Sequence, residues 1–551
     1  MDTFATLAPP GTYVAPAGPL VGRLVANTEL LKALFRHAGF ARYCFFVGEA
    51  ADREALHQLF VEPGHLAPER MVTPNLLELP AALETGAVSV LHHAAHVEQL
   101  FDLVWLRDRH ARASVPVTGQ IHSLSYPRLM TSYARGVLHP PGPGDAIFCT
   151  STAGRLVLEK SFASAARAVA GAGGTAHPLA CELPVIPLGV DVDQLRTGDR
   201  AATRARLGIP DDAIVVLSLG RFTEYDKMDL FPLVQVFAQA RARRAPGSRP
   251  LRLLLAGARQ GTKTPEMLQL WAQAFGVADA LTLCVDFAEA DKRHLLAAAD
   301  IFVSPCDNLQ ETFGISVAEA MAAGLAPVVS DFDGYKDTVP PDVGIRVKTR
   351  WHPDQSFLSE LGPLLYERPL HLLLGQSVEV DLGELEDAIV ALAADDRRRA
   401  DLSRRATAHA RARFDWRVVV AAYERVWRRL AAVPRPAEAA THIRPPLAMS
   451  FGEVFSHYPS EPIAADRPLS RTQVARTLCA TQNGYIIYPE LKNVFSGDDV
   501  LAALALVGDR EGAGRITIGD LTECLQPRFP WASLWRARLL VTWLLKHGLV
   551  R

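Results

Sequence analysis

Two carboxylates, Glu311 and Glu319, lie eight positions apart in the stretch Asn308–Gly334, which is otherwise rich in small and branched apolar residues. A predicted strand, Ile301–Val303, precedes this stretch and leads through a turn into a helix that begins near Gly314 and ends at Gly324, where glycine suits a C-terminal cap. Because a helix rises about 1.5 Å per residue, the two carboxylates should lie on the order of 10 Å apart. That separation matches the distance from the sugar ring to the ribose of a nucleotide-sugar.

The start of this helix could bind an anion. The backbone N–H groups of Phe313, Gly314 and Ile315 have no partner within the helix, and such groups attract negative charge. The stretch can therefore hold hydroxyl groups at both ends and a negative charge between them.

A structural explanation is the alternative: Glu319 would be a solvated helix-surface carboxylate, and Glu311 a favourable charge at the helix N-terminus. The neighbouring residues count against it, because Ala318, Ala320 and Met321 leave little polar surface on the helix. Burying Glu319 without hydrogen-bonding partners would be costly. The functional interpretation is therefore favoured.

Short apolar runs alternate with longer amphipathic stretches up to about residue 432. This alternation is typical of the α/β class, in which helices cover both faces of a parallel sheet and ligands bind at the carboxyl ends of the strands. The predicted strands are Tyr43–Val47, Val88–Leu91, Pro116–Ile121, Ala146–Cys149, Ile214–Leu219, Leu251–Ala256, Leu281–Val285, Ile301–Val303 and Pro327–Ser330. The predicted helices include Thr28–Phe40, Leu230–Arg244, Ala288–Ala299 and Trp416–Leu430.

Proline-rich segments divide the chain at Pro184–Val190 and at Ala431–Pro446. We therefore expect two Rossmann-like domains, at residues 1–186 and 187–432. A linker at 433–448 and a small, mainly helical module at 449–551 should follow them.

The composition indicates a folded, soluble protein, because 49% of the 551 residues are hydrophobic and 21% are charged. A formal charge of -2 disfavours nucleic acid as a partner. The seven scattered cysteines are typical of reduced thiols in a cytosol. The N-terminus lacks the pattern of a signal peptide and no apolar run is long enough to span a membrane, so we expect a cytoplasmic protein.

The motif QETFGISVAEAMAAG, which contains both glutamates, resembles the signature of retaining, nucleotide-sugar-dependent glycosyltransferases of family 4, the group 1 glycosyltransferases. The resemblance extends over about residues 18–430. The segments Ile186–Asp191, Leu217–Arg221 and Phe414–Trp416 are similar to that family's hinge, first donor-domain strand and closing helix. It implies the GT-B fold, in which two Rossmann-like domains face each other across a cleft, with the acceptor on the first domain and the donor on the second.

The resemblance also implies roles for individual residues. Glu311 would bind sugar hydroxyls and Glu319 the ribose, while Thr312, Phe313, Gly314 and Ile315 would line the donor site. Arg221 and Lys227 would neutralise the departing diphosphate. This agrees with their position after a predicted strand, although a basic residue there is usually just solvated.

Weaker matches complete the implied site. His122 follows a predicted strand, where relatives place a histidine near the transferred sugar; a structural cap of the strand is the alternative. Gly18 and Gly22 fit loosely to a glycine-rich loop that approaches the donor. Phe287 falls where relatives bind the nucleobase through the backbone.

Two short motifs could suggest a metal, namely His92-His93 with His96, and Asp331-Phe332-Asp333. The histidines lack nearby acidic residues, and the cations and the helix start already supply positive charge for a diphosphate. We therefore expect no essential metal and no cofactor beyond the nucleotide-sugar as co-substrate.

The C-terminal module is nearly neutral, with eleven Lys or Arg against ten Asp or Glu from Met449 onward. The pattern from Ile516 to Leu521, followed by a Leu- and Trp-rich helix, is faintly similar to PqqD-type, winged-helix peptide-binding domains. Near-neutral charge disfavours DNA. A peptide- or protein-docking role and a plain stabilising role remain as alternatives.

The leading hypothesis is a retaining hexosyltransferase that moves a sugar from a UDP-sugar to the hydroxyl of an unidentified small molecule, glycan, lipid or peptide. The resemblance implies front-face substitution, in which the leaving phosphate accepts the acceptor's proton, and domain closure that excludes water. A GT-B epimerase or phosphorylase is the alternative among enzymes, and a catalytically silent scaffold is the alternative outside them. The joint presence of Arg221, Lys227, Glu311 and Glu319 favours an enzyme.

Overall fold

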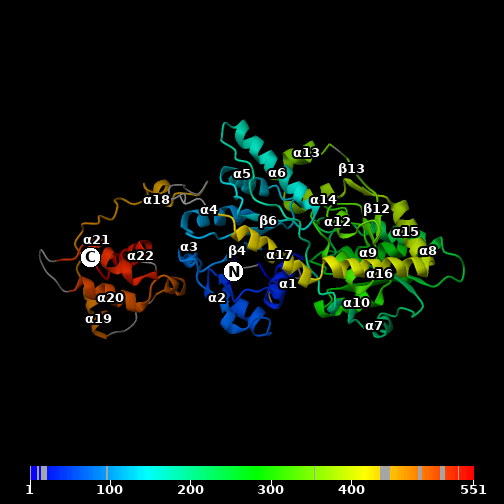
Figure 1. Ribbon diagram of the computed structural model, residues 1–551, viewed down its shortest axis with the longest axis horizontal. Coiled ribbons are helices and arrows are strands. Elements are labelled where there is room, and N and C mark those ends of the chain that lie inside the picture. The colour runs from blue at the N-terminus through cyan, green and yellow to red at the C-terminus, as the bar shows by residue number, and fades with distance from the viewer. Residues whose placement is uncertain are drawn as a thin grey trace. The chain divides into compact units, whose positions relative to one another are not determined.

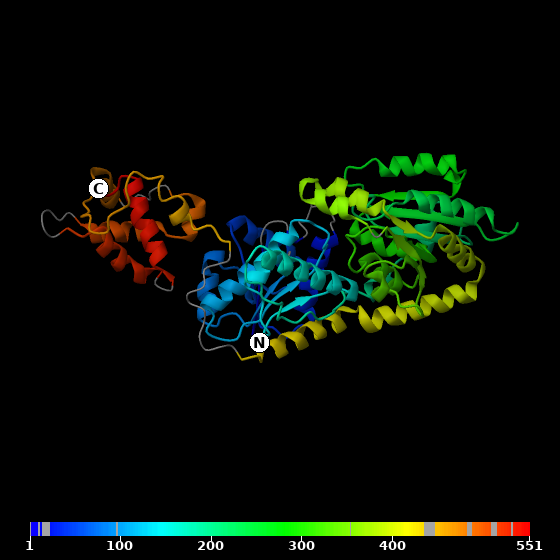
Figure 2. The same cartoon turned by 90° about the horizontal axis from the view of Figure 1, so that it is seen from above.

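The computed structural model describes residues 2–8, 12–13, 22–94, 97–352, 354–434, 447–481, 487–508, 515–530 and 533–551. It divides into two compact units, Met1–Pro446 and Leu447–Arg551 (Figures 1 and 2). The first unit contains two α/β domains, each built on its own parallel sheet. The predicted linker at 433–448 falls mostly outside the described residues.

The first sheet has the strand order β3-β2-β1-β4-β5-β6. Its strands are β1 (Thr3–Leu7), β2 (Arg42–Phe46), β3 (Met71–Val72), β4 (Val90–His93), β5 (Val117–Gln120) and β6 (Ala146–Phe148). Its helices are α1 (Gly22–His37), α2 (Ala50–Leu56), α3 (Leu79–Glu84), α4 (Leu100–His110), α5 (Leu129–Leu138) and α6 (Thr152–Gly171).

The second sheet has the order β12-β11-β10-β7-β8-β9, which is the same topology. Its strands are β7 (Ile214–Leu219), β8 (Leu251–Gly257), β9 (Leu281–Val285), β10 (Ile301–Ser304), β11 (Ala326–Ser330) and β12 (Ile345–Val347). Its helices are α7 (Arg200–Arg206), α8 (Phe231–Ala242), α9 (Thr264–Ala274), α10 (Lys292–Ala298), α11 (Ile315–Ala323), α12 (Tyr335–Thr338), α15 (Leu382–Ala394) and α16 (Asp396–Arg413). A small antiparallel pair, β13 (Thr349–Trp351) and β14 (Val378–Val380), accompanies α13 (Ser356–Leu361) and α14 (Glu367–Gly375).

The central strands of both sheets are buried on both faces, as their continuous apolar runs predict. Along β7, Val215 and Leu217 join the core under α10, α11 and α16, whereas Ile214 and Val216 join the core under α8, α9 and α15. This alternation follows from the two-residue period of a strand. The expected α/β architecture of two Rossmann-like domains is confirmed.

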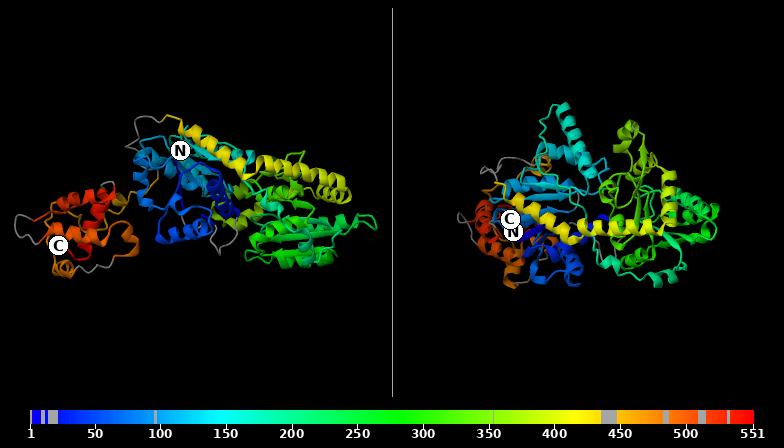
Figure 3. Two further views of the ribbon diagram at one scale, coloured as in Figure 1. Left: turned by 60° about the horizontal axis from the view of Figure 1, so that its bottom comes forward. Right: turned by 45° about the vertical axis from the view of Figure 1, so that its right-hand side comes forward.

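The last helix of the first unit, α17 (Trp416–Ala431), belongs to the core of the first domain although it follows the second in sequence. It completes the sheet face that α1 and α2 also cover, and Figure 3 shows the yellow segment running from one domain to the other. The indole Nε1 of Trp427 donates to Thr118 Oγ1 on β5 at 3.1 Å. The closing helix that the resemblance implies is therefore present.

The second unit is helical and has its own buried core. Its helices are α18 (Phe451–Val454), α19 (Gln473–Thr481), α20 (Gly497–Val507), α21 (Ile518–Leu525) and α22 (Leu534–Lys546). Its described residues form no strand, but isolated antiparallel bridges join Pro468 to Thr517 and Arg471 to Val550. The helical character agrees with the sequence, while the similarity to winged-helix peptide-binding domains stays a prediction.

His92, at β4, is a core residue of the first domain. Its Nδ1 lies 3.0 Å from Thr118 Oγ1, and its ring packs against the rings of Phe4, Phe148, Tyr423 and Trp427. Burial lowers the pKa of His92 to about 3. These surroundings support the structural interpretation of this histidine; His96 lies outside the described residues.

The first prediction concerns acid stability. His92 stays neutral in the fold but binds a proton in the unfolded chain, so the free energy of unfolding should fall as the pH drops from about 6.5 towards 3. At pH 4.5 this one group should lower that free energy by roughly 2–3 kcal/mol relative to pH 7. The variant His92→Gln should lose this part of the pH dependence. Urea unfolding of both proteins at pH 7 and 4.5 measures it, and parallel pH dependences would contradict it.

Candidate active site

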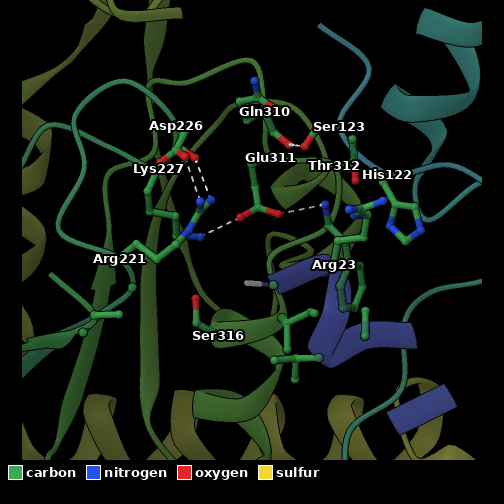
Figure 4. Close-up of a pocket in the computed structure, with 18 of the residues that line it drawn as sticks. Arg23, His122, Ser123, Arg221, Asp226, Lys227, Gln310, Glu311, Thr312 and Ser316 are labelled. Carbon is green, nitrogen blue, oxygen red and sulfur yellow. Dashed lines mark hydrogen bonds and ion pairs between the residues drawn. The ribbon is translucent and has the colours of Figure 1, made fainter. Parts of the chain in front are cut away.

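The site residues meet in a cavity of about 400 Å³ between the two domains of the first unit (Figure 4). On the second domain it lies at the carboxyl ends of β7 and β10, where the strand order reverses and where α/β sheets bind ligands. Of the residues that the sequence predicts for the site, those that line this cavity are Gly22, His122, Arg221, Lys227, Phe287, Glu311, Thr312, Phe313, Ile315 and Glu319. Gly314 caps helix α11 beside them.

Lys227 and Glu311 form a largely buried ion pair at the centre of the site, with Lys227 Nζ 2.6 Å from Glu311 Oε2. Burial works against the charge of both groups. The Glu311 carboxylate nevertheless raises the pKa of Lys227 above its ordinary value, and the Lys227 ammonium with two backbone N–H groups lowers the pKa of Glu311. Both side chains are therefore charged at neutral pH.

Glu311 also caps the helix start. Its Oε1 accepts hydrogen bonds from the N–H groups of Gly314, at 2.7 Å, and Phe313, at 3.3 Å. In this structure those two groups hold the protein's own carboxylate, whereas the sequence assigns them to a ligand anion. Glu311 therefore has the alternative, structural role of a favourable charge at the helix N-terminus, and it also lines the cavity.

Ser316, in the first turn of α11, is a cavity residue that the sequence does not predict. Its hydroxyl is buried, makes no hydrogen bond with any described residue, and points towards the end of the Lys227 side chain in Figure 4. Because a hydroxyl both donates and accepts, it can bind a polar ligand atom there.

The turn before α11 requires glycine at one position. Gly314 has a φ of 91°, and a Cβ added to it would lie 2.3 Å from Cε1 of Tyr335. Both the left-handed conformation and the close ring exclude a larger residue. Gly22 differs, because an added Cβ would meet no atom within 4 Å, and Gly18 lies outside the described residues.

Arg221 follows β7 and is held by Asp226. Its Nη1 lies 2.8 Å from Asp226 Oδ2, and its Nη2 donates to the Asp226 carbonyl at 3.0 Å. This pairing orients the guanidinium along the cavity wall, and the sequence alone did not single out Asp226.

Glu319 has the partner that its burial requires. Its side chain on α11 is 8% exposed, and its Oε1 accepts from Lys292 Nζ on α10 at 2.8 Å. Lys292 also contacts Glu289. Burial opposes the charge of Lys292, but the two carboxylates raise the pKa of this lysine above its ordinary value. Burial raises the pKa of Glu319, and Lys292 acts in the opposite direction.

The first domain contributes His122 and Arg23. His122 Nε2 lies 2.7 Å from the Ala94 carbonyl, and because a carbonyl only accepts, this nitrogen carries the proton. Burial lowers the pKa of Arg23, which lines the cavity and which the sequence did not single out. Phe287 follows β9 and packs against the core of the second domain.

The residues of Asp331-Phe332-Asp333 turn to different partners. Asp331 Oδ1 lies 3.3 Å from Arg346 Nε, while Asp333 Oδ1 accepts from the Tyr335 N–H at 3.3 Å. Across the part of the chain that the structure describes, no group of three or more His, Cys, Asp or Glu side chains could hold a metal ion. Metal independence stays a prediction.

Comparison with solved structures identifies the fold. The structure of sucrose-phosphate synthase from Thermosynechococcus elongatus is similar with a TM-score of 0.51 and 18% identity, over 78% of this chain and 100% of that one. The Anabaena HepE structure in complex with UDP gives a TM-score of 0.52 and 16% identity over the same shares. The facing Rossmann-like domains are therefore the GT-B fold of glycosyltransferases.

Sequence comparison finds relatives of the second domain. Residues 199–356, which lie in that domain, match the family model described as glycosyl transferases group 1. D-inositol 3-phosphate glycosyltransferase of Stackebrandtia nassauensis is 33% identical over 190 residues, and that of Geodermatophilus obscurus is 30% identical over 297. These alignments cover 34% and 50% of this chain, and the chain spans 42% and 62% of the two relatives.

No helix among the described residues combines the length and hydropathy needed to cross a membrane.

The second prediction tests the central ion pair through stability. Lys227→Met should lower the free energy of unfolding by about 3 kcal/mol, because Glu311 would stay buried without its counter-charge. Adding Glu311→Gln should recover most of that loss. Chemical unfolding of both single variants and the double variant gives the coupling. The exposed ion pair of Lys348 with Glu384 supplies the control Lys348→Met, which should leave the free energy of unfolding close to that of the parent. Equal losses for the two lysines would contradict the prediction.

Proposed function

We propose that the protein is a retaining glycosyltransferase that moves a sugar from a UDP-sugar to an acceptor hydroxyl. The observation that carries the proposal is the meeting of Arg221, Lys227, Glu311 and Glu319 in one cleft cavity of a GT-B fold. The group 1 family match supports it. The complexes of Anabaena HepE with UDP, and with UDP and glucose, support UDP as the nucleotide of the donor.

In this proposal the donor diphosphate lies between Arg221, Lys227 and the start of α11. The Lys227 ammonium has three N–H groups. One of them donates a hydrogen bond to Glu311, so the ammonium can also donate to phosphate oxygens. The unbonded hydroxyl of Ser316 supplies a further contact at the same place. Glu311 binds hydroxyls of the transferred sugar, and Glu319 binds the ribose through the oxygen that Lys292 does not hold.

The proposed reaction is a front-face substitution. The bond between the sugar C1 and the phosphate oxygen breaks, the acceptor oxygen bonds to C1 on the same face, and the leaving phosphate takes the acceptor proton. Arg221 and Lys227 stabilise the charge that grows on the diphosphate. His122, whose Nε2–H donates to the Ala94 carbonyl, binds a sugar hydroxyl or positions the acceptor. No step requires a metal ion, and activity should persist in EDTA.

The acceptor is proposed only as a hydroxyl group. The curated relatives are named for D-inositol 3-phosphate, which makes it one reasonable candidate for an acceptor screen. Epimerised donor or phosphate-dependent cleavage would instead identify the alternative GT-B enzymes.

The third prediction concerns the donor site. UDP at a hundredfold excess over its dissociation constant should stabilise the fold by about 2.7 kcal/mol, visible as a raised melting temperature. A nucleoside alone should bind too weakly for a hundredfold excess over its dissociation constant to be reached. Arg221→Ala should lower kcat by about 100-fold, because it removes charge stabilisation in the transition state. Glu319→Ala should mainly raise the donor KM, by about tenfold.

Released UDP, assayed with a panel of UDP-sugars and acceptors, measures these effects. Arg241→Ala is the control, because Arg241 lies in the last turn of α8, outside the cavity, where it forms a surface ion pair with Asp279. If Arg221→Ala and Glu319→Ala both transfer sugar as fast as this control, the donor site is misassigned. If no UDP-sugar yields UDP and no nucleoside diphosphate stabilises the protein, the proposed function is wrong.

A further inference from the structure

Two hydroxyl groups of the first domain reach across the cleft to the turn that carries Glu311. Ser123 Oγ donates to the Gln310 carbonyl at 3.2 Å, and Thr150 Oγ1 donates to the Thr312 carbonyl at 3.1 Å. These are the carbonyl groups immediately before and after Glu311. Ser123 comes from the segment after β5, and Thr150 from the segment between β6 and α6.

The second domain holds the base of the same turn. The Asn308 amide donates to the Tyr225 carbonyl at 2.7 Å, and the Gln310 N–H donates to Asn308 Oδ1 at 3.0 Å. Lys227 and the start of α11 hold the Glu311 carboxylate itself. The backbone on either side of Glu311 is therefore tied to the first domain, while its carboxylate is tied to the second.

A buried histidine strengthens this link between the domains. His371 on α14 is 3% exposed, its Nε2 lies 3.1 Å from Ser125 Oγ of the first domain, and its Nδ1 lies 2.7 Å from the Gln310 side-chain amide. Gln310 is 8% exposed. Gln310 is thus linked to the first domain in two ways. Its carbonyl accepts from Ser123, and its side chain contacts His371, which in turn contacts Ser125.

We propose that Ser123 and Thr150 are positioning residues, which set the Glu311 turn for sugar transfer only while the two domains are closed on each other. The inference rests on the proposed function and adds to it the coupling between closure and the sugar site. Neutral hydroxyl-to-carbonyl bonds are individually weak, so they can break when the cleft opens for donor entry and form again on closure. A displaced catalytic group loses rate steeply, so opening would switch the sugar site off.

The competing explanation is that these bonds only hold the domains together. The structure contains contacts that separate the two ideas. Arg128 of the first domain forms an ion pair with Glu367 on α14, and Asp337 accepts from the Thr152 N–H. Both contacts join the same two domains without touching the Glu311 turn.

The fourth prediction uses Thr150→Val, which removes the hydroxyl at nearly constant volume, and Ser123→Ala, singly and together in the full chain. Each single variant should lower kcat about tenfold and the double variant more, with the UDP dissociation constant within about twofold of the parent. Thr150→Ser keeps the hydroxyl and should restore kcat. Glu367→Gln removes a cross-domain ion pair and should leave kcat unchanged.

Hydrogen exchange provides a readout that does not depend on turnover. The amides of Phe313 and Gly314 are bonded to Glu311, so their exchange should accelerate in the double variant but not in Glu367→Gln. Melting temperatures of all variants confirm that they fold.

The inference is overturned if the double variant exchanges these amides at the parental rate, if Thr150→Ser is as slow as Thr150→Val, or if Glu367→Gln lowers kcat as much as the hydroxyl variants. A parent protein that neither binds UDP nor releases it from any UDP-sugar refutes the proposed function. The exchange result still decides whether the hydroxyls position the turn.

Discussion

The ion pair between Lys227 and Glu311 is the interaction on which the site depends. Each charge is buried deeply enough to be unfavourable alone, and each is kept by the other together with the N–H groups that open α11. The pair forms because β7 and β10 are neighbours in the second sheet, so that the segments after them meet at its carboxyl edge. Without that adjacency a lysine and a glutamate 84 positions apart would each need water.

The same logic extends outward from the pair. Lys292 balances the second buried carboxylate, Glu319, and so allows an otherwise apolar helix to carry an acid at the cavity wall. Ser123 and Thr150 hold the backbone on both sides of Glu311 from the opposite domain. Helix α17 follows the second domain in sequence and packs in the core of the first. The contacts between the two domains therefore lie within one compact unit.

Much of the fold was predictable because its signals are local. Continuous apolar runs predict strands such as Ile214–Leu219 and Leu281–Val285, whose observed bounds are the same. The strands missed have interrupted patterns or are very short: β1 contains Thr3 and Thr6, β12 contains Arg346, and β3, β13 and β14 have only two or three residues. Their strand character comes from pairing with neighbours across the sheet, which a short segment does not encode.

The sequence by itself determined the α/β class, the paired glutamates on either side of a helix start, and the cationic residues after a strand, since each depends on residues close together along the chain. Only the tertiary structure decided what each charge meets: Asp226 for Arg221, Lys292 for Glu319, and Glu311 itself for the helix N–H groups. Lys292 comes from another segment, whereas Asp226 lies five residues from its arginine and Glu311 lies two and three residues from the N–H groups that it binds. Which buried group neutralises which is settled by packing, because desolvated charges accept only a partner that the fold brings within hydrogen-bonding distance.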